Sequence, residues 1–215
     1  RVTGEHTIEE TDDGMTRLVN ECVGDGRLPG GETFFERELD GARAHREAAM
    51  RGENGVDNLA PYSSYNYVSS SQPVVLFSSP NEGAGGLKDS AHNAVERGEF
   101  AVNVVTEALA EAMDATSERL PPDESEFDRA GVERAPCDRI DAPRVADAVV
   151  TMECELYDTI EIHDRLTILG DVVRFHVDDA VLTDDRIDMR KIRTVGRLGG
   201  PYYTVSDRME YERQY

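Results

Sequence analysis

The chain has 215 residues, which suits one domain or one domain with an extension, and its apolar content of 39% is ordinary for a globular protein. Its 44 acidic and 23 basic residues give a net charge of −21, which would repel nucleic-acid phosphates and anionic lipids, so we expect neither as a partner. The acids are spread along the sequence rather than gathered in a tail. This spread favours a surface adapted to high salt (a halophilic protein) over an acidic tail that binds a basic partner.

The cysteine pattern and the hydropathy favour a cytoplasmic protein. Cys22, Cys137 and Cys154 are odd in number and widely spaced, which is typical neither of a disulfide framework nor of a zinc site. No apolar run approaches the ~20 residues that a membrane-spanning helix needs. No charged-then-apolar signal peptide opens the sequence.

The first half of the chain predicts a polar segment followed by alternating strands and helices. Residues 1–57 are polar and irregular, and within them 41–50 (GARAHREAAM) predicts a short exposed helix. The β-rich run 74–79 (VVLFSS), between two prolines, predicts a buried strand. Residues 89–98 predict a helix that Asp89 or Ser90 caps and Gly98 ends, and a further strand is expected at 100–105.

The second half predicts two long strands. Residues 107–116 indicate a short helix with Leu109, Ala112 and Met113 on one face, and the proline-rich, acidic stretch 117–147 indicates a long surface excursion. Residues 149–162 alternate, with Met152, Cys154 and Leu156 facing one way and Thr151, Glu153 and Glu155 the other, which predicts a half-buried antiparallel strand.

The chain then continues as a strand over 166–182, in which Gly170 marks a bend or bulge. Residues 188–195 predict a helical turn, and RLGGPYY (197–203) predicts a tight glycine corner. Several strands with only short helices between them favour an antiparallel barrel with helical decorations over a repeating βαβ fold.

The stretch EGAGGLKDS (82–90) lies where a nucleotide-binding turn would lie, but it matches neither the dinucleotide fingerprint nor the Walker A loop. Lys88 does stand beside the start of the helix predicted from Asp89. Exposed N–H groups and a cation at a helix start can hold a phosphate, the helix end contributing ~0.3–1 kcal/mol. The alternative is a plain helix cap with a solvated lysine.

No catalytic or metal-binding constellation stands out. The histidines are scattered without metal-ligand spacing, and neither HExxH nor a GxSxG elbow is present. We expect surface or strand histidines and no metal.

The stretch 58–73, NLAPYSSYNYVSSSQP, is uncharged, and half of its residues carry a hydroxyl. One interpretation is structural, because serine and tyrosine are common in turns and at sheet edges. The other is an uncharged bed of backbone and hydroxyl groups around a flat, polar, phosphorylated ligand such as a flavin.

Three blocks together resemble one family. NGVDNLAPYSSYNYVSSSQPVVLFSS, KDSAHNAVERGEFAVNVV and RLGGPYY are similar in letters, order and spacing to the flavin reductase-like family, whose fold is the FMN-binding split β-barrel. The similarity runs from about Gly52 to about Tyr203. The resemblance implies a homodimer with FMN in a groove near the dimer interface.

The resemblance also implies which residues meet the cofactor. The APYSS-like loop would line the flavin ring, largely through backbone groups, and the serine-rich strand end and the KDS turn would lie near the ribityl phosphate. Asn103 would support the loop or touch the cofactor. The implied set is Ala60, Pro61, Tyr62, Ser63, Ser64, Ser78, Ser79, Lys88, Asp89, Ser90 and Asn103.

The N-terminal part departs from the family. An apolar strand of RPIA-x-VST type is expected directly before the GxxG-x-x-N-x-AP block, but GARAHREAAMRGENG stands there. The first barrel strand is then missing or replaced, because the N-terminus is divergent or because the reading frame or gene start upstream of about residue 51 is wrong. We expect an atypical segment over 1–50, which could be poorly ordered, and a flavin reductase-like split-barrel domain over 51–215.

The resemblance implies an FMN-dependent oxidoreductase of the flavin reductase type. Hydride would pass from NAD(P)H to the flavin and on to an acceptor, with a redox partner protein as one candidate. The cofactor carries that chemistry, so no side chain need act as an acid or a base. The alternatives are an FMN electron carrier without a nicotinamide site and a cofactor-less barrel that serves as a binding module.

Overall fold

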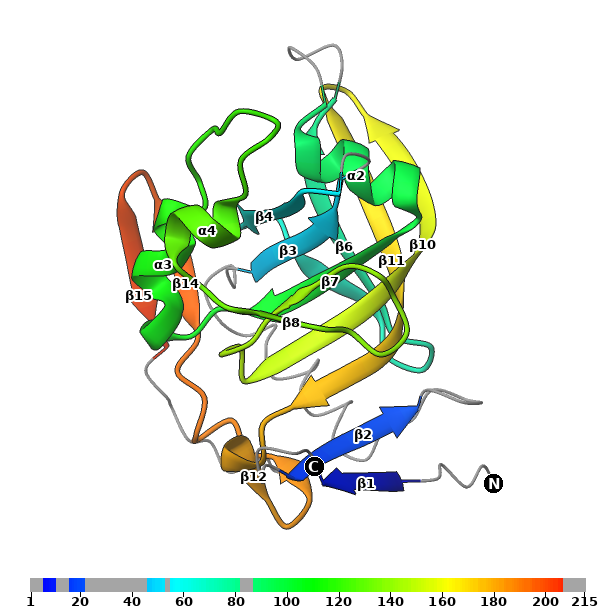
Figure 1. Ribbon diagram of the computed structural model, residues 1–215, viewed down its shortest axis with the longest axis vertical. Helices are drawn as coiled ribbons and strands as arrows, with labels where there is room; N and C mark the ends of the chain where they lie inside the picture. The colour runs from blue at the N-terminus through cyan, green and yellow to red at the C-terminus, as the bar shows by residue number, and fades with distance from the viewer. Residues whose placement is uncertain (1–5, 11–15, 22–45, 53–54, 82–86, 207–215) are drawn as a thin grey trace, which may run out of the picture.

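The computed structural model describes residues 6–10, 16–21, 46–52, 55–81 and 87–206, and nine of the described strands form one antiparallel sheet with short helices around it (Figure 1). The sheet contains β1 (His6–Glu10), β2 (Thr16–Glu21), β3 (Arg46–Arg51), β4 (Asp57–Tyr62), β5 (Asn66–Ser69), β6 (Val74–Pro80), β7 (Glu99–Val104), β10 (Val150–Ile162) and β11 (Arg165–Val177). The expected mainly-β, antiparallel fold is confirmed.

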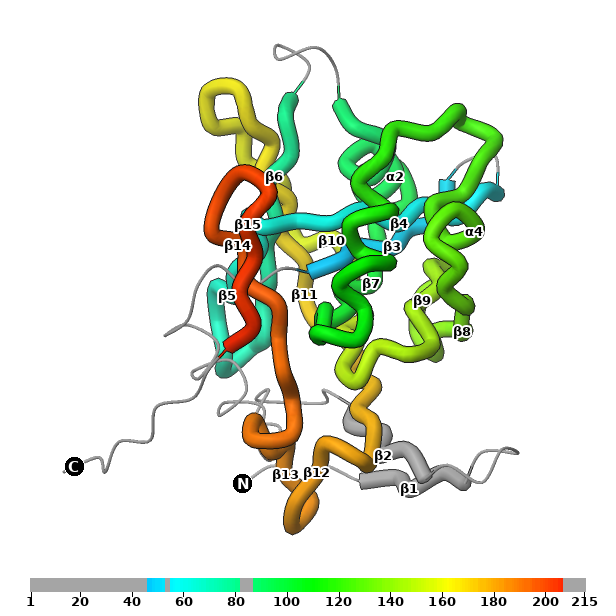
Figure 2. Tube along the Cα trace, turned by 90° about the vertical axis from the view of Figure 1, so that its left-hand side faces the viewer, coloured from blue at the N-terminus to red at the C-terminus, as the bar shows by residue number. Residues whose placement is uncertain are grey.

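The strand order curls the sheet into a split barrel. Strands β4, β3, β7, β10 and β11 are neighbours in that order. On its other edge, β11 pairs with two strands in turn. Its first half, Arg165–Asp171, pairs with β6, and Arg174 and Phe175 pair with β2. β6 in turn pairs with β5. Figure 2 shows the strands of the barrel from a direction at right angles to Figure 1.

Three two-stranded ribbons and five helical segments complete the described chain. The ribbons pair β8 (Arg134–Ala135) with β9 (Arg144–Val145), β12 (Leu182–Thr183) with β13 (Arg186–Ile187), and β14 (Val195–Gly199) with β15 (Tyr202–Val205). The helical segments are α2 (Asp89–Arg97), η2 (Glu107–Leu109), α3 (Ala110–Ala115), α4 (Glu126–Ala130) and η3 (Asp179–Val181). None of the described helices is long and apolar enough to cross a membrane.

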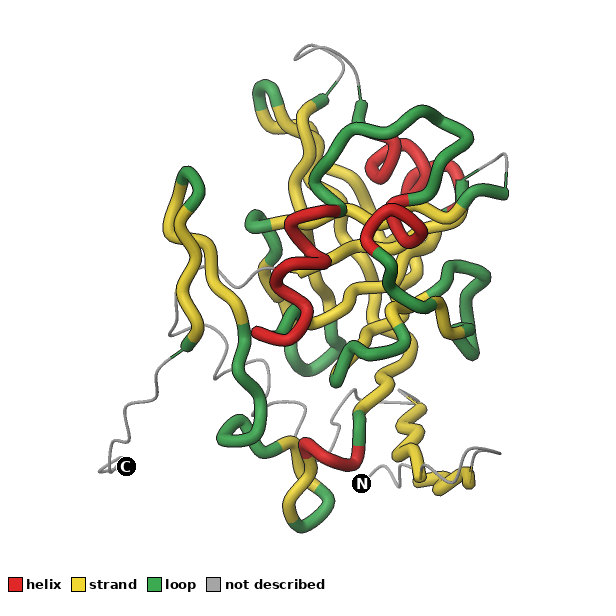
Figure 3. The backbone as a smooth tube through the Cα atoms, turned by 60° about the vertical axis from the view of Figure 1, so that its left-hand side comes forward, coloured by secondary structure: helices red, strands yellow, loops and turns green. Residues whose placement is uncertain are grey.

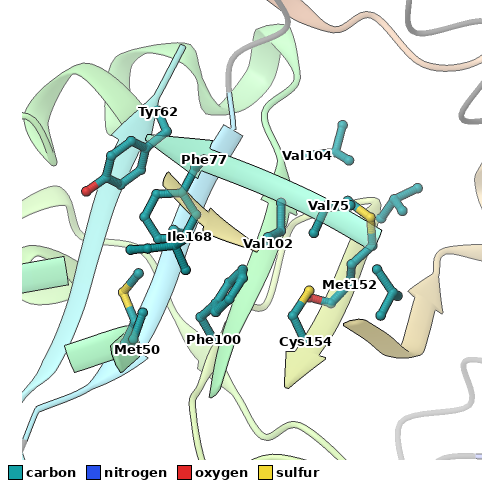
Figure 4. Close-up of a cluster of buried hydrophobic side chains, with 14 of the residues drawn as sticks. Met50, Tyr62, Val75, Phe77, Phe100, Val102, Val104, Met152, Cys154 and Ile168 are labelled. Atoms are coloured by element: carbon teal, nitrogen blue, oxygen red, sulfur yellow. The ribbon is translucent and has the colours of Figure 1, made fainter. Parts of the chain in front are cut away.

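The barrel interior is the main hydrophobic core. Alternate residues of each strand point inward, as the two-residue period of a strand requires. Its largest fully buried side chains are those of Met50, Phe77, Phe100, Met152 and Ile168 (Figure 4). Helix α2 packs against the barrel through Ala91 and Ala94, which are fully buried, and it ends at Gly98 in the left-handed conformation.

A second core lies outside the barrel, beneath α3 and α4, which Figure 3 shows close together on one side of the sheet. Ala49 and Ala101 on the outer face of the sheet pack there with Met113, Phe127 and Val145. The stretch 117–147 is therefore not only the surface excursion that the sequence predicts, because its apolar residues cover this face of the sheet.

The expected helix at 41–50 is wrong for the residues that the structure describes, since 46–51 form β3. β3 lies between β4 and β7 and pairs with both. Its alternate residues enter the two cores, with Ala48 and Met50 inside the barrel and Ala49 outside. The strand expected before the NLAPYS block is thus present, because burial on both faces outweighs the helical propensity of alanine, glutamate and arginine.

The other expectations for residues 1–50 fall mostly on positions outside the described residues. The described exceptions are β3 and the hairpin of β1 and β2, which pair over His6–Glu10 and Thr16–Glu21. No clear strand signal was identified in this part of the sequence.

The long strands β10 and β11 are confirmed, with a difference on one face. Glu153 and Thr151, expected on the solvent side, are fully buried because the 136–148 segment covers them. The register of β10 and β11 shifts between Leu156 and Asp158, and Leu156 pairs with Gly170 at the edge of this shift, as expected for a bulge near that glycine. The corner at 197–203 is the β14–β15 turn, with positive φ at Gly199 and Gly200.

Candidate functional site

The end of β4, the turn after it, the end of β6 and the start of α2 meet at one place in the fold. Ala60, Pro61 and Tyr62 end β4, and Ser63 and Ser64 form the turn into β5. Ser78 and Ser79 lie near the end of β6, and Lys88, Asp89 and Ser90 lie at the start of α2. Ten of the eleven residues predicted for the cofactor site therefore come from three adjoining segments, which hydrogen bonds connect.

The serine turn is bound to β6. Ser64 Oγ donates to the Ser78 carbonyl oxygen at 2.9 Å and accepts from the Ser78 backbone N–H at 3.0 Å. The Ser78 hydroxyl in turn shares a 2.9 Å hydrogen bond with the Thr167 hydroxyl of β11. The Ser64 hydroxyl therefore pairs with the backbone of β6 as another strand's backbone would, and it holds the turn against β6. Ser63 is half-buried.

Tyr62 connects β4 to α2. Its hydroxyl shares a 2.5 Å hydrogen bond with the Ser90 hydroxyl, and its ring lies 4.5 Å from the Phe77 ring, centroid to centroid (Figure 4). Burial raises the pKa of Tyr62, and hydrogen bonds with the Ser90 and Ser79 hydroxyls act in the opposite direction. Because Tyr62, Ser79 and Ser90 are all buried, their side chains set the position of the site's backbone. Their contact with a cofactor stays a prediction.

The start of α2 offers a cation and free helix-end donors. Lys88 is the N-cap residue, and it and Asp89 are exposed. The expected cap by Asp89 or Ser90 is wrong, because both lie inside the helix and no described side chain caps it. The hydroxyl of Ser90 is instead engaged with Tyr62. A helix N-terminus without a side-chain cap, next to a lysine, suits an anionic ligand.

Asn103 lies apart from the other ten residues. It is fully buried on β7, between Val102 and Val104, whose side chains point into the barrel, so its own side chain points outward. Its Oδ1 accepts from the Val145 N–H and the Thr151 hydroxyl, each at 3.0 Å. Its Nδ2 donates to the Glu47 carbonyl oxygen at 3.3 Å. Asn103 therefore holds β9 and the outer layer against the sheet.

Sequence reasoning missed Arg46 beside this site. Arg46 begins β3 opposite Tyr62 and is 1% exposed, and its guanidinium lies 5.2 Å from the centre of the Tyr65 ring. Burial lowers the pKa of Arg46 to about 10, with Tyr65 acting in the opposite direction. Arg46 was not predicted as a site residue because an arginine on the expected exposed helix at 41–50 would be an ordinary solvated side chain.

Comparison with known proteins agrees with this fold. The family model described as "Flavin reductase like domain" matches residues 46–193, so it begins at the first residue of β3. An uncharacterized protein of Aquifex aeolicus is 36% identical over 152 residues, 70% of this chain and 78% of that protein. One of Halalkalibacterium halodurans is 35% identical over 176 residues, 78% of this chain and 84% of that protein.

Two solved structures are similar over most of the chain. Nitrilotriacetate monooxygenase component B from Bacillus cereus has a TM-score of 0.75 and 29% identity, with 88% of this chain and 97% of that chain covered. The 2-nitrobenzoate 2-nitroreductase of Pseudomonas fluorescens has a TM-score of 0.72 and 27% identity, with 86% of this chain and 92% of that chain covered.

Proposed function

Since this chain belongs to the flavin reductase-like domain family, we propose that it is an FMN-dependent oxidoreductase that uses NAD(P)H as its reductant. When bound, FMN accepts a hydride from the nicotinamide and passes the electrons on to an acceptor. The observation that carries the proposal is the connected site itself, in which the serine turn, the end of β6 and the uncapped start of α2 adjoin.

The residues present fit the chemical groups of FMN. The backbone of Ala60–Tyr62 and the turn residues Ser63 and Ser64 supply neutral donors and acceptors for the edge of the flavin ring. Lys88 and the first N–H groups of α2 supply a positive end for the phosphate. We expect Ser78 to lie between these two parts, near the ribityl chain.

The protein's contribution is to orient the cofactor. The Ser64–Ser78 bonds fix the turn against β6, and the Tyr62–Ser90 bond fixes β4 against α2. These bonds fix the distance between the serine turn, proposed to contact the flavin ring, and the start of α2, proposed to contact the phosphate. The site then needs little rearrangement when the cofactor binds. We assign no acid or base role to a side chain, because hydride transfer requires none.

We further propose that the protein works as a cytoplasmic homodimer with the flavin near the subunit interface. Val68 on β5, and Tyr157, Ile160 and Ile162 on β10, are exposed apolar side chains that a second copy could cover. The acceptor would be a partner protein or a small oxidised molecule. Size-exclusion chromatography with light scattering checks the dimer, and a monomer at micromolar concentration would contradict it.

An anaerobic titration of the FMN-loaded protein with NADH and NADPH tests the function. We expect the flavin absorption to bleach with one equivalent of reduced nicotinamide, because two electrons pass per hydride. Bleaching by dithionite but by neither nicotinamide would overturn the NAD(P)H step while leaving FMN binding intact. A chain that takes up no FMN at high ionic strength would overturn the whole proposal.

A further inference from the structure

A cluster of three potential metal ligands lies on the outer face of the sheet, away from the residues assigned to the flavin. Glu153 comes from β10, His176 from β11 and Cys137 from the segment between β8 and β9. One ligand atom from each, a thiol sulfur, a carboxylate oxygen and an imidazole nitrogen, lies within 4.8 Å of the other two. We propose that these three residues bind one divalent transition-metal ion of the zinc type.

Backbone donors orient the carboxylate of Glu153 toward His176. Its Oε2 accepts from the backbone N–H groups of Arg139 at 2.7 Å and Ile140 at 3.2 Å. Its Oε1 accepts from the Asp138 N–H at 2.8 Å, and its remaining lone pair faces His176 Nε2 in a close contact. An ion between Oε1 and Nε2 would replace a single proton there, while the three backbone donors keep the carboxylate oriented, as outer-shell partners of metal ligands do.

Charge and burial favour a dication at this position. Glu153 is 0% exposed and His176 is 6% exposed, so the carboxylate stands in a medium where an uncompensated charge is costly. A dication held by one carboxylate, one thiolate and one neutral imidazole forms a neutral unit. Sulfur, nitrogen and oxygen ligands together are typical of zinc, and three protein ligands leave a fourth position for water, which can enter beside the half-buried Cys137.

Metal binding would exchange the S–H proton of Cys137, which is released to solvent, for a metal–sulfur bond. The site would fasten the 136–142 segment to β10 and β11, to which the Arg174–Asp138 ion pair at 2.7 Å already joins it.

Titration of the chelator-treated 215-residue chain with Co²⁺, at constant high KCl, tests the proposal. We expect a thiolate-to-cobalt charge-transfer band in the near ultraviolet and ligand-field bands at wavelengths beyond flavin absorption. Cys137→Ser should abolish the charge-transfer band and weaken binding at least ~10-fold. His163→Asn, which removes an exposed histidine, should leave both signals unchanged.

A measurement on the unchanged sequence covers the case in which Cys137→Ser does not fold. X-ray absorption of the chain loaded with one equivalent of Zn²⁺ should show one sulfur at about 2.3 Å together with nitrogen or oxygen ligands. A shell of oxygen alone, or a charge-transfer band that survives in Cys137→Ser, would overturn the proposal. Neither readout depends on flavin binding, so its outcome is independent of the proposed function.

Discussion

At the scale of single residues, Glu47 is the most unusual charge in the sheet. It is 1% exposed, and its Oε1 accepts a 2.9 Å hydrogen bond from the Thr116 hydroxyl. Burial raises the pKa of Glu47 to about 7, and the Thr116 hydrogen bond acts in the opposite direction. The folded state therefore holds a proton on Glu47 at pH values at which the unfolded chain, with a pKa near 4.5, has lost it.

This difference makes stability fall as pH rises. Between about pH 4.5 and 7 the folded state binds more protons at this site than the unfolded state does, so the unfolding free energy decreases with pH and levels off above 7. The decrease is of the order of 3 kcal/mol. Glu47→Gln, whose amide oxygen can still accept from Thr116, should remove this decrease and be the more stable protein at pH 8. Denaturant unfolding from pH 4.5 to 8 measures the unfolding free energy of both proteins. An equal decrease of this free energy with pH in the two proteins would contradict the prediction.

Lys88, at the start of α2, is the residue that we propose to contact the phosphate of the flavin. Its loss should raise the Kd for FMN roughly 5- to 10-fold, because a charge-assisted contact with the phosphate, partly exposed to solvent, is worth about 1–1.4 kcal/mol. Lys191→Ala is the matched control, since Lys191 is the only other lysine, and it donates to the Leu182 carbonyl oxygen in a turn outside the site.

Quenching of FMN fluorescence at one fixed KCl concentration measures both Kd values. Binding of riboflavin, which lacks the phosphate, should be the same in the Lys88→Ala variant and in the unchanged chain. An equal loss for riboflavin and FMN would show that Lys88 acts on the fold of the site rather than on the phosphate.

At the scale of elements, the packing of β7, β10 and β11 in the barrel requires that residue 170 of β11 has no side chain. A Cβ at this position would lie 2.5 Å from Phe100 Cζ and 2.9 Å from Cys154 Cβ. Gly170→Ala should therefore destabilise the barrel by about 1–3 kcal/mol through overpacking. Phe100→Leu removes the ring atoms that a new methyl group would meet, so the double variant should be more stable than the sum of the two single losses predicts. Thermal unfolding of the four proteins measures this coupling, and strict additivity would exclude the clash.

Local sequence signals were reliable for elements with a clear hydrophobic period or clear terminal residues. The strand at 74–79, the helix at 89–98 and the long hairpin of β10 and β11 have clear periodicity or terminal residues, and each is present. They failed for β3, whose residues Arg46–Arg51 suit a helix by composition. Its strand state follows from pairing with β4 and β7, and such pairing is not visible in a six-residue window.

For the candidate sites too, local sequence patterns indicate some residues, whereas only the fold brings the others together. The segments around NLAPYSS and KDS, which the structure brings together, could be singled out because the hydroxyl-rich stretch and the helix start are local patterns. Asn103 was placed with them by resemblance, but the alternation of β7 points its side chain outward. The Cys137–Glu153–His176 cluster carries no sequence signal, because its members come from three elements and only the register of β10 and β11 and the fold of the covering segment bring them together.

At the scale of the whole molecule, the net charge of −21 should make stability depend on salt. Self-repulsion opposes folding at low ionic strength, and counter-ions within a Debye length of about 3 Å at 1 M salt screen it. One part of this repulsion can be located, because Glu155 lies in register with Glu99 on β7 and Asp171 on β11, so three carboxylates form a row across three strands. Like charges directly opposite one another on a sheet are destabilising by about 0.2–1 kcal/mol.

We therefore expect the melting temperature to rise steadily from low to multimolar KCl. Glu155→Gln removes the central charge of the row, so it should be more stable than the unchanged chain in low salt, and this difference should shrink as KCl screens the repulsion. Thr159→Ser, a neutral change on the same strand, should keep the salt dependence of the unchanged chain. If the melting temperature is the same in low and multimolar KCl, the acidic surface is not an adaptation to salt. If the gain from Glu155→Gln is constant across KCl concentrations, the row of carboxylates does not act through charge.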